Sequence, residues 1–152
     1  MQVYLTKTQT GLIPADKETE AWYNKIKSGE VVSSDFKKTR NYQFLKKWFA
    51  LLNVGFDNWN PGEVNSNYGI PEKNFERFRE DVTILAGYFH TVVRLDSSVR
   101  IEAKSVAFSN MTEEEFSALY NKTINVLLKR VYNSTLTKEE LENIVNQYMA
   151  FA

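Results

Sequence analysis

The chain contains no cysteine. Disulfide bridges, thiolate zinc sites and thiol nucleophiles are therefore excluded, and the absence suits a reducing compartment. One histidine and six glycines leave no histidine-based metal motif and no glycine-rich phosphate loop. No apolar run approaches the roughly eighteen residues of a membrane span, and the N-terminus has no basic region followed by an apolar stretch. We expect a cytoplasmic protein that is not attached to a membrane and uses no cofactor.

Charge of either sign is also not in excess, because 19 basic residues balance 19 acidic residues. The electrostatic field of the whole molecule therefore does not indicate a nucleic-acid-binding protein. A function of that kind has to rest on local clusters of charge.

The residues that are present are those of a folded domain. Hydrophobic residues make up 43% of the chain and aromatic residues 14%, which is too much for a disordered protein. A chain of 152 residues is long enough to bury one sizeable core. We expect a single domain over residues 1–152.

Apolar residues at spacings of three and four predict five helices. They are expected over residues 15–27 and 41–57, from Pro71 through Phe89, and behind two capping boxes that begin at Thr112 and Thr137. In each box the threonine hydroxyl and the carboxylate three residues later satisfy backbone donors at the helix start. The chain is therefore expected to end in two helices.

β-rich runs predict a few short strands. They are expected over residues 3–7, 11–13 and 30–36, and in a hairpin formed by residues 91–95 and 99–103, with 106–108 as a candidate extension. Residues 58–69 are rich in Asn, Gly, Pro and Ser, which predicts a surface loop. Together these patterns predict an α+β fold, with about five helices packed on a small, mainly antiparallel sheet and a helical C-terminus.

Basic residues cluster in one segment, residues 37–47, which we call the basic segment. Its cations are Lys37, Lys38, Arg40, Lys46 and Lys47, and counted from Asp35 these five basic residues stand against that one acidic residue. Such a cluster can bind phosphates by releasing counterions, and Tyr42 and Trp48 could stack on bases. The alternative is a solvated helix face, with Trp48 buried as its place on the apolar stripe indicates.

The predicted hairpin carries Arg94, Arg100 and Lys104. Because side chains alternate along a strand, Arg100, Glu102 and Lys104 share one face, which could contact a nucleic-acid backbone. Salt bridges across the strands are the alternative interpretation. Lys129 and Arg130 close a helix and are expected to complement its dipole.

The sequence offers only one candidate set of catalytic residues. Asp96, Glu102 and Lys104 faintly resemble the two carboxylates and lysine of metal-dependent nucleases, but Asp96 belongs to the expected turn. His90 has no partner at a spacing typical of a metal site or a triad, and we interpret it as structural. We therefore expect a protein that binds rather than catalyses, with no metal.

Two parts of the chain carry the pattern of a known family. The first combines Glu30-Val31-Val32, Phe36-Lys37-Lys38-Thr39-Arg40-Asn41 and Lys46-Lys47-Trp48-Phe49-Ala50-Leu51-Leu52, and the second is Ser109-Asn110-Met111-Thr112-Glu113-Glu114-Glu115-Phe116-Ser117-Ala118-Leu119. Both parts resemble the NinB-like recombination family of lambdoid phages. The chain is also similar to phage and prophage proteins of unassigned function. This similarity lies in Arg40-Asn41, Lys47-Trp48-Phe49-Ala50-Leu51-Leu52-Asn53-Val54-Gly55-Phe56 and Trp59. The resemblance implies a homodimeric recombination mediator that binds single-stranded DNA, with Arg40, Lys47 and Trp48 at its site. The last expected helix departs from the pattern, because it brings Glu139, Glu140 and Glu142.

We therefore expect a phage accessory protein that binds single-stranded DNA without sequence preference. Its homodimer contact is expected at the apolar end of the chain, through Tyr148, Met149 and Phe151. The alternative is a phage-encoded inhibitor or modulator of a host defence complex, such as an anti-CRISPR protein, or of a host recombination complex. Acidic patches at residues 113–115 and 139–142 favour that alternative, because they could engage a basic groove on a partner protein.

Overall fold

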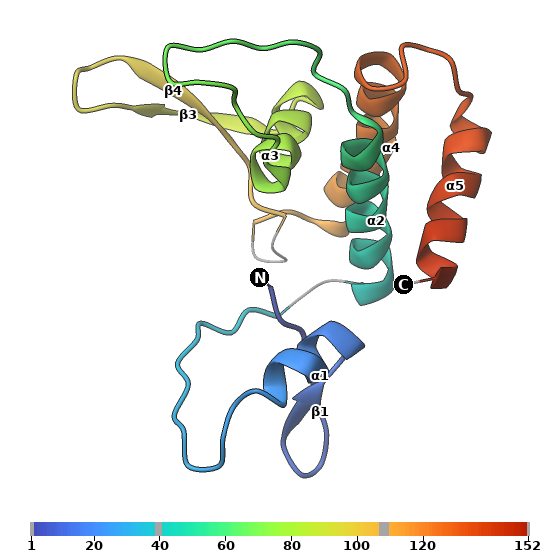
Figure 1. Cartoon of the computed structure of the whole chain (residues 1–152). Helices are drawn as coiled ribbons and strands as arrows, with labels where there is room; N and C mark the ends of the chain where they lie inside the picture. Colours follow the sequence, from blue (N-terminus) through green and yellow to red (C-terminus); the bar gives the residue numbers. More distant parts are fainter. Residues whose placement is uncertain (1, 39–40, 107–109, 152) are drawn as a thin grey trace. The chain divides into compact units, whose positions relative to one another are not determined.

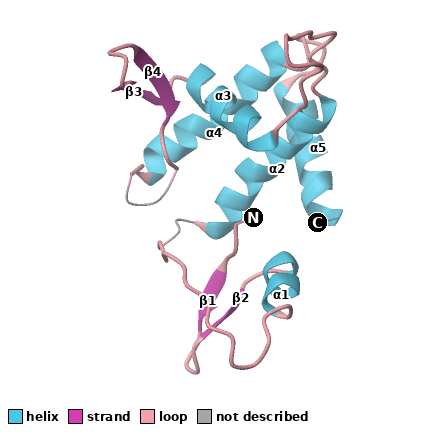
Figure 2. Ribbon diagram, turned by 60° about the vertical axis from the view of Figure 1, so that its left-hand side comes forward, coloured by secondary structure: helices cyan, strands magenta, loops and turns pink. Residues whose placement is uncertain are grey.

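The computed structural model of the chain describes residues 2–38, 41–106 and 110–151, with Phe151 described by its backbone only. The chain divides into two compact units, Met1–Phe36 and Lys37–Ala152. Both combine helices with antiparallel strands (Figures 1 and 2). The α+β class, the hairpin and the helical C-terminus are confirmed. None of the helices in the described ranges is long and apolar enough to cross a membrane.

The first unit is a short hairpin with one helix. Strands β1 (Leu5–Lys7) and β2 (Leu12–Pro14) pair antiparallel, and helix α1 (Lys17–Tyr23) follows. The Asp16 carboxylate caps α1 by accepting from the Thr19 N–H at 2.7 Å. The Thr19 hydroxyl is buried and accepts from the Tyr4 N–H at 3.0 Å, which ties the helix to the start of the hairpin.

The strand predicted over residues 30–36 is wrong. Residues 30–38 run as irregular chain, and Val31 and Val32 are exposed. Alternation of side chains favours a strand only where a neighbouring strand supplies hydrogen bonds and one face is covered. Neither condition is met in the described part of the first unit.

The second unit is built on helix α2 (Tyr42–Asn58), which lies beside α4 (Glu113–Arg130) and α5 (Lys138–Phe151) (Figure 1). Leucines, isoleucine and valine from all three helices form a fully buried core. Gly55 lets α2 approach α4 closely, because a Cβ atom there would lie 2.8 Å from a methyl group of Leu127. The prediction of a helix over residues 41–57 is confirmed, with Asn41 as its cap.

Helix α3 (Phe75–Leu85) is shorter than its pattern indicates, because it begins later than Pro71 and ends earlier than Phe89. Its first residue, Phe75, lies four residues after Pro71. Asn74 caps the helix, because its side chain accepts from the Arg77 N–H at 2.9 Å. It ends before Gly87, whose φ of 92° allows its N–H and that of Tyr88 to bond back to the last turn. Phe89 therefore belongs to a strand and not to this helix.

Lys73 binds the chain just before α3 to the end of α2. Its ammonium donates to the carbonyl oxygens of Phe56 at 2.6 Å and Trp59 at 2.7 Å. These acceptors lie at the C-terminal end of α2, where carbonyl groups lack helical partners and attract a cation. The loop predicted over residues 58–69 is thus fastened at its far end to the helix that precedes it.

Both capping boxes are confirmed as helix starts. The Thr112 hydroxyl accepts from the Glu115 N–H at 3.1 Å at the start of α4. At the start of α5 the bonding is reciprocal: Thr137 accepts from the Glu140 N–H at 3.2 Å, and the Glu140 carboxylate accepts from the Thr137 N–H at 3.4 Å.

Strands β3 (Phe89–Val93) and β4 (Val99–Ala103) form a second hairpin, which projects from the helices of the second unit (Figure 1). The two hairpins are separate two-stranded sheets and not one sheet. The Arg94 and Ser98 backbones close a three-residue turn, and Ser97 at its end has a φ of 68°. The candidate extension over residues 106–108 lies mostly outside the described residues.

Candidate nucleic-acid interface

The basic segment surrounds the N-terminal end of α2. Lys37 and Lys38 are exposed on the chain that leads to the helix, and Lys46 and Lys47 are half-buried in its second turn. The first turn of α2 contains no acidic residue. The positive end of the helix dipole and these four lysines therefore act in the same direction. Arg40 lies outside the described residues.

Aromatic rings hold the two helical lysines. The ammonium group of Lys46 lies 5.5 Å from the ring centre of Tyr42, and that of Lys47 lies 5.4 Å from the ring centre of Tyr120. Burial, with a smaller contribution from Glu142, raises the pKa of Tyr120 to about 12. Its phenol stays neutral at physiological pH, so each lysine keeps its charge over an uncharged ring.

The structure corrects the expectation that Trp48 contacts bases. Its side chain is 0% exposed, and its indole N–H donates to the Thr123 hydroxyl at 3.1 Å. Its ring also packs on Phe116 with 5.9 Å between the ring centres. Trp48 joins α2 to α4 in the core, whereas Tyr42 in the basic segment keeps partial access to solvent.

The polar face of the second hairpin carries the other predicted cations. The register places Arg100 opposite Val92 and Glu102 opposite His90, so Arg94, Arg100 and Glu102 share one face by alternation. Arg100 Nε lies 3.6 Å from Glu102 Oε1, and His90 Nε2 lies 3.7 Å from Glu102 Oε2. The expected salt bridging is therefore present, and one carboxylate reduces the positive charge of this face.

Two further residues singled out in the sequence, Lys104 and His90, lie at the base of the hairpin and on β3. Lys104 is exposed one residue after β4, and its N–H donates to the Tyr88 carbonyl at 3.0 Å. His90 is half-exposed on β3 beside Glu102, in a surface position. Figures 1 and 2 show the hairpin and the first turn of α2 apart from each other, so the two groups of cations form separate surfaces.

The nuclease-like residues are not brought together. The Asp96 carboxylate accepts from the N–H and hydroxyl of Ser98 at 2.9 and 2.6 Å, and these bonds, led by the hydroxyl, lower its pKa. Glu102 lies four residues beyond Ser98 along β4, which is about 13 Å. Asp96 therefore serves the turn. Within the ranges that the structure describes, no three potential metal ligands gather at one point.

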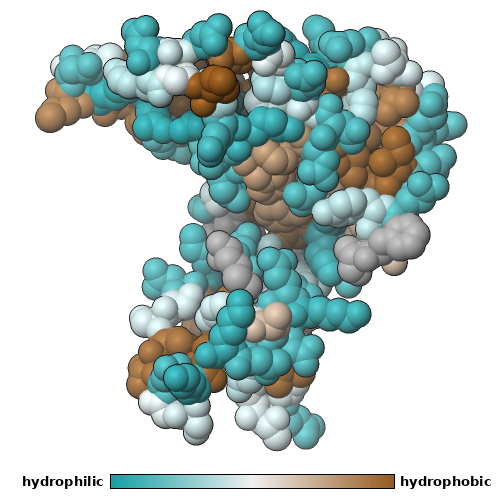
Figure 3. Space-filling model, viewed as in Figure 1, coloured by the Kyte–Doolittle hydropathy of each residue, from teal (hydrophilic) through white to brown (hydrophobic). Residues whose placement is uncertain are grey.

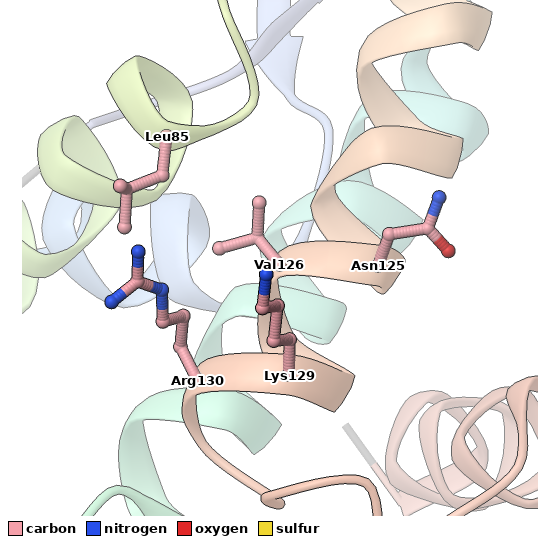
Figure 4. A pocket seen from close by; sticks show the side chains of 5 residues that line it. All are labelled: Leu85, Asn125, Val126, Lys129 and Arg130. Atoms are coloured by element: carbon pink, nitrogen blue, oxygen red, sulfur yellow. The ribbon is translucent and has the colours of Figure 1, made fainter.

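A shallow depression of about 200 Å³ lies between α3 and the end of α4, and Figure 4 shows the side chains that line it. Leu85 and Val126 form its apolar part, and Asn125, Lys129 and Arg130 its polar part. The two cations lie in the last turn of α4, as expected of residues that complement a helix dipole. Their side chains are exposed, so the depression does not enclose a ligand.

Sequence reasoning missed the uncharged face of the second hairpin. Phe89, Thr91 and Val93 of β3 share this face with Val99 and Ile101 of β4, and we call these five residues the apolar strip. All five are exposed, and Figure 3 shows hydrophobic side chains at the outer end of the hairpin. The alternation was visible in the sequence, but alternation predicts that such a face is covered.

The family model DUF1367 matches the chain over residues 1–67 and 63–151. The chain belongs to the DUF1367 family. The description of DUF1367 reads "protein of unknown function". No curated protein and no solved structure matches the chain. The matched ranges of DUF1367 include the basic segment, the second hairpin and both C-terminal helices.

Proposed function

We propose that this DUF1367 protein is a phage accessory protein of DNA recombination that binds single-stranded DNA without sequence preference. It acts as a recombination mediator in the cytoplasm of a bacterial host cell. The observation that carries the proposal is the basic segment, where four described lysines stand before and within the first two turns of α2, whose first turn contains no acidic residue. The resemblance to NinB-like proteins supplies the biological setting.

The chemistry of the basic segment favours a phosphate backbone over a specific base sequence. Lysine ammonium groups neutralise phosphates and release counterions, which gives affinity without reading base edges. Lys37 and Lys38 are exposed before the helix, and Lys46 rests on the half-buried ring of Tyr42. That ring is half-buried and can stack on a base. Arg40 belongs to the same segment and is part of the proposal.

The polar face of the second hairpin is proposed as a weaker contact. Arg94, Arg100 and Lys104 are exposed, but Glu102 lies within 3.6 Å of Arg100 and repels phosphates. A contact of this kind adds affinity at low salt and little at physiological salt. The basic segment is therefore the primary site of the proposal.

A homodimer is also part of the proposal. Its contact was expected at the end of α5, where Tyr148 is exposed and Met149 is half-buried; the side chain of Phe151 lies outside the described residues. Two copies would present two basic segments to one strand. The combined affinity would then exceed that of a single copy by effective concentration.

A titration of a fluorescent single-stranded oligonucleotide with matched variants tests the site. The test variant Lys37→Glu/Lys38→Glu/Lys46→Glu reverses three charges of the basic segment. The control Lys122→Glu/Lys129→Glu/Arg130→Glu reverses three exposed charges of α4. It also matches the ring contact, because Lys122 lies 5.2 Å from the Tyr88 ring centre as Lys46 lies near Tyr42.

We expect the test variant to bind at least about tenfold more weakly than wild type, and the control to stay within about threefold. Circular dichroism and the urea midpoint establish that both variants are folded. Equal loss in both variants would show that net charge, and not the basic segment, drives binding. Undiminished binding by the test variant would refute the proposed site.

A second candidate function is inhibition or modulation of a host defence or recombination complex by protein contact. The loop between α2 and α3 favours it, because Tyr68 is 100% exposed and Ile70 is 86% exposed. Ser66 holds this turn by donating its hydroxyl to the Gly69 carbonyl at 2.7 Å. An ordered turn that displays an aromatic and an aliphatic side chain is suited to a protein partner.

Size-exclusion chromatography of the chain with purified host recombination or defence complexes tests the second candidate. We expect a stoichiometric complex that Tyr68→Ser/Ile70→Ser abolishes and that the test variant of the basic segment retains. A complex that depends instead on the basic segment, or the absence of any complex, would count against it.

A further inference from the structure

We propose that the apolar strip of the second hairpin is a self-association surface, on which the strips of two copies of the chain pack face to face. This inference deepens the proposed homodimer and rests on that part of the proposed function alone. It assigns the contact to β3 and β4 and not to the end of α5. DNA binding can fail without affecting it.

The strip is continuous across both strands. The register sets Thr91 opposite Ile101 and Val93 opposite Val99, with Phe89 opposite Ala103. Phe89 is 41% exposed, Val93 76%, Val99 62% and Ile101 49%, and Leu95 at the turn is fully exposed. No charged residue stands at any of these positions.

Such a hairpin is poorly suited to stand alone in water. A two-stranded ribbon by itself is marginally stable. Helix α3 packs against β4 but leaves the apolar strip exposed, so covering that face adds stabilisation. The opposite face has no such need, because Arg94, Arg100, His90 and Glu102 are solvated there. The occupant of the strip therefore has to be apolar and uncharged.

A second copy of the strip meets these requirements. The exposed side chains of the strip and Leu95 supply part of the roughly 800 Å² that each partner contributes to a stable complex, which fits a weak dimer whose population rises with concentration. A two-fold axis pairs one patch with itself and needs no second surface. Two sheets packed this way lie about 10 Å apart. The arginines of both copies then point outward, so no like charges are brought together.

The absence of cysteine makes a direct test possible, because one introduced cysteine is the only thiol in the chain. Thr91→Cys places it at the centre of the apolar strip, and His90→Cys places it on the opposite face of the same strand. Under mild oxidation, or with a short bis-maleimide, we expect Thr91→Cys to form a covalent dimer at least about tenfold faster than His90→Cys. Equal rates would overturn the proposal.

Sedimentation equilibrium without DNA supplies the second measurement. The mass of wild type should rise from 17.7 kDa toward twice that value with concentration. Val93→Thr/Ile101→Thr keeps β-branched side chains, so the hairpin is retained while the strip loses apolar surface. We expect its dimer dissociation constant to rise at least about tenfold.

Two controls separate this proposal from its alternatives. Tyr148→Ser should leave the dimer intact, and loss of the dimer in that variant alone would assign the contact to α5. The Lys37→Glu/Lys38→Glu/Lys46→Glu variant should dimerise as wild type does, so a failure of DNA binding is distinguishable from a failure of association. A wild type that stays monomeric at millimolar concentration overturns the inference.

Discussion

Single residues of α2 take their roles from burial. The indole of Trp48 is fully buried against α4, whereas Tyr42 in the first turn of the same helix is only half-buried. Both are aromatic residues among lysines in the sequence. Trp48 can be the buried one of the two because its indole N–H, which needs an acceptor when buried, donates to the Thr123 hydroxyl on the facing helix.

The Trp48 contact predicts a coupled loss of stability. Trp48→Phe removes a donor and leaves a small cavity, so the free energy of unfolding should fall by about 2 kcal/mol. Thr123→Val leaves the indole N–H without an acceptor and should cost about 1 to 2 kcal/mol. The double variant should cost less than the sum of the two, because the shared bond is lost only once.

Urea unfolding of the four proteins measures this coupling. Additive losses would mean that the hydrogen bond contributes nothing. Trp48→Phe should also bind single-stranded DNA with wild-type affinity while it remains folded. A selective loss of DNA binding would mean that Trp48 acts at the surface after all.

At the scale of elements, the second hairpin combines a polar face, an apolar face and a turn in which the Asp96 carboxylate accepts two hydrogen bonds. Ser98 donates two hydrogen bonds to ionised Asp96, and these hold the pKa of Asp96 below that of an ordinary aspartate. Because the folded pKa is the lower one, the ionised turn stabilises the hairpin above the unfolded pKa of about 4. That contribution is lost as pH falls through the folded pKa.

The pH dependence of the Ser98 amide resonance checks this behaviour. We expect a titration midpoint below that of an unfolded aspartate, with faster amide exchange across the hairpin under more acidic conditions. Asp96→Ala should remove the titration and leave Ser98 insensitive to pH in this range. A midpoint at or above that of a free aspartate would contradict the bonding at the turn.

Elements with strong local signals were predictable from the sequence. The apolar stripe of α2 and the capping residues Thr112 and Thr137 act within one or two helical turns, so the helices they start were predicted correctly. The strand over residues 30–36 failed because strand formation depends on a partner distant in the sequence. The start of α3 failed because Lys73 and Asn74 set it, through contacts with α2 and within the cap.

The candidate sites were only partly predictable for the same reason. The lysines of the basic segment and the arginines of the hairpin were identified from charge, which needs no fold. The burial of Trp48 and the exposure of the apolar strip depend on which helices pack together and which faces stay uncovered. Such information is not local, so the sequence pattern left both interpretations of Trp48 open and did not reveal that the apolar side of the hairpin is exposed.

At the scale of the whole molecule, a net charge of zero sets how strongly the proposed DNA binding can act. No long-range field steers a nucleic acid toward the chain. Affinity has to come from short-range contacts between phosphates and the lysines of the basic segment. Binding of this kind is weak for one copy and is removed by modest salt.

The salt dependence of binding to single-stranded DNA tests the central claim most directly. The observed binding constant of wild type for an oligothymidylate is measured at several sodium chloride concentrations. Four lysine–phosphate contacts predict a straight line in a double-logarithmic plot with a slope of about −3, since each contact to a single strand contributes about −0.7. No binding at the lowest salt concentration, or binding that salt does not weaken, would contradict the account.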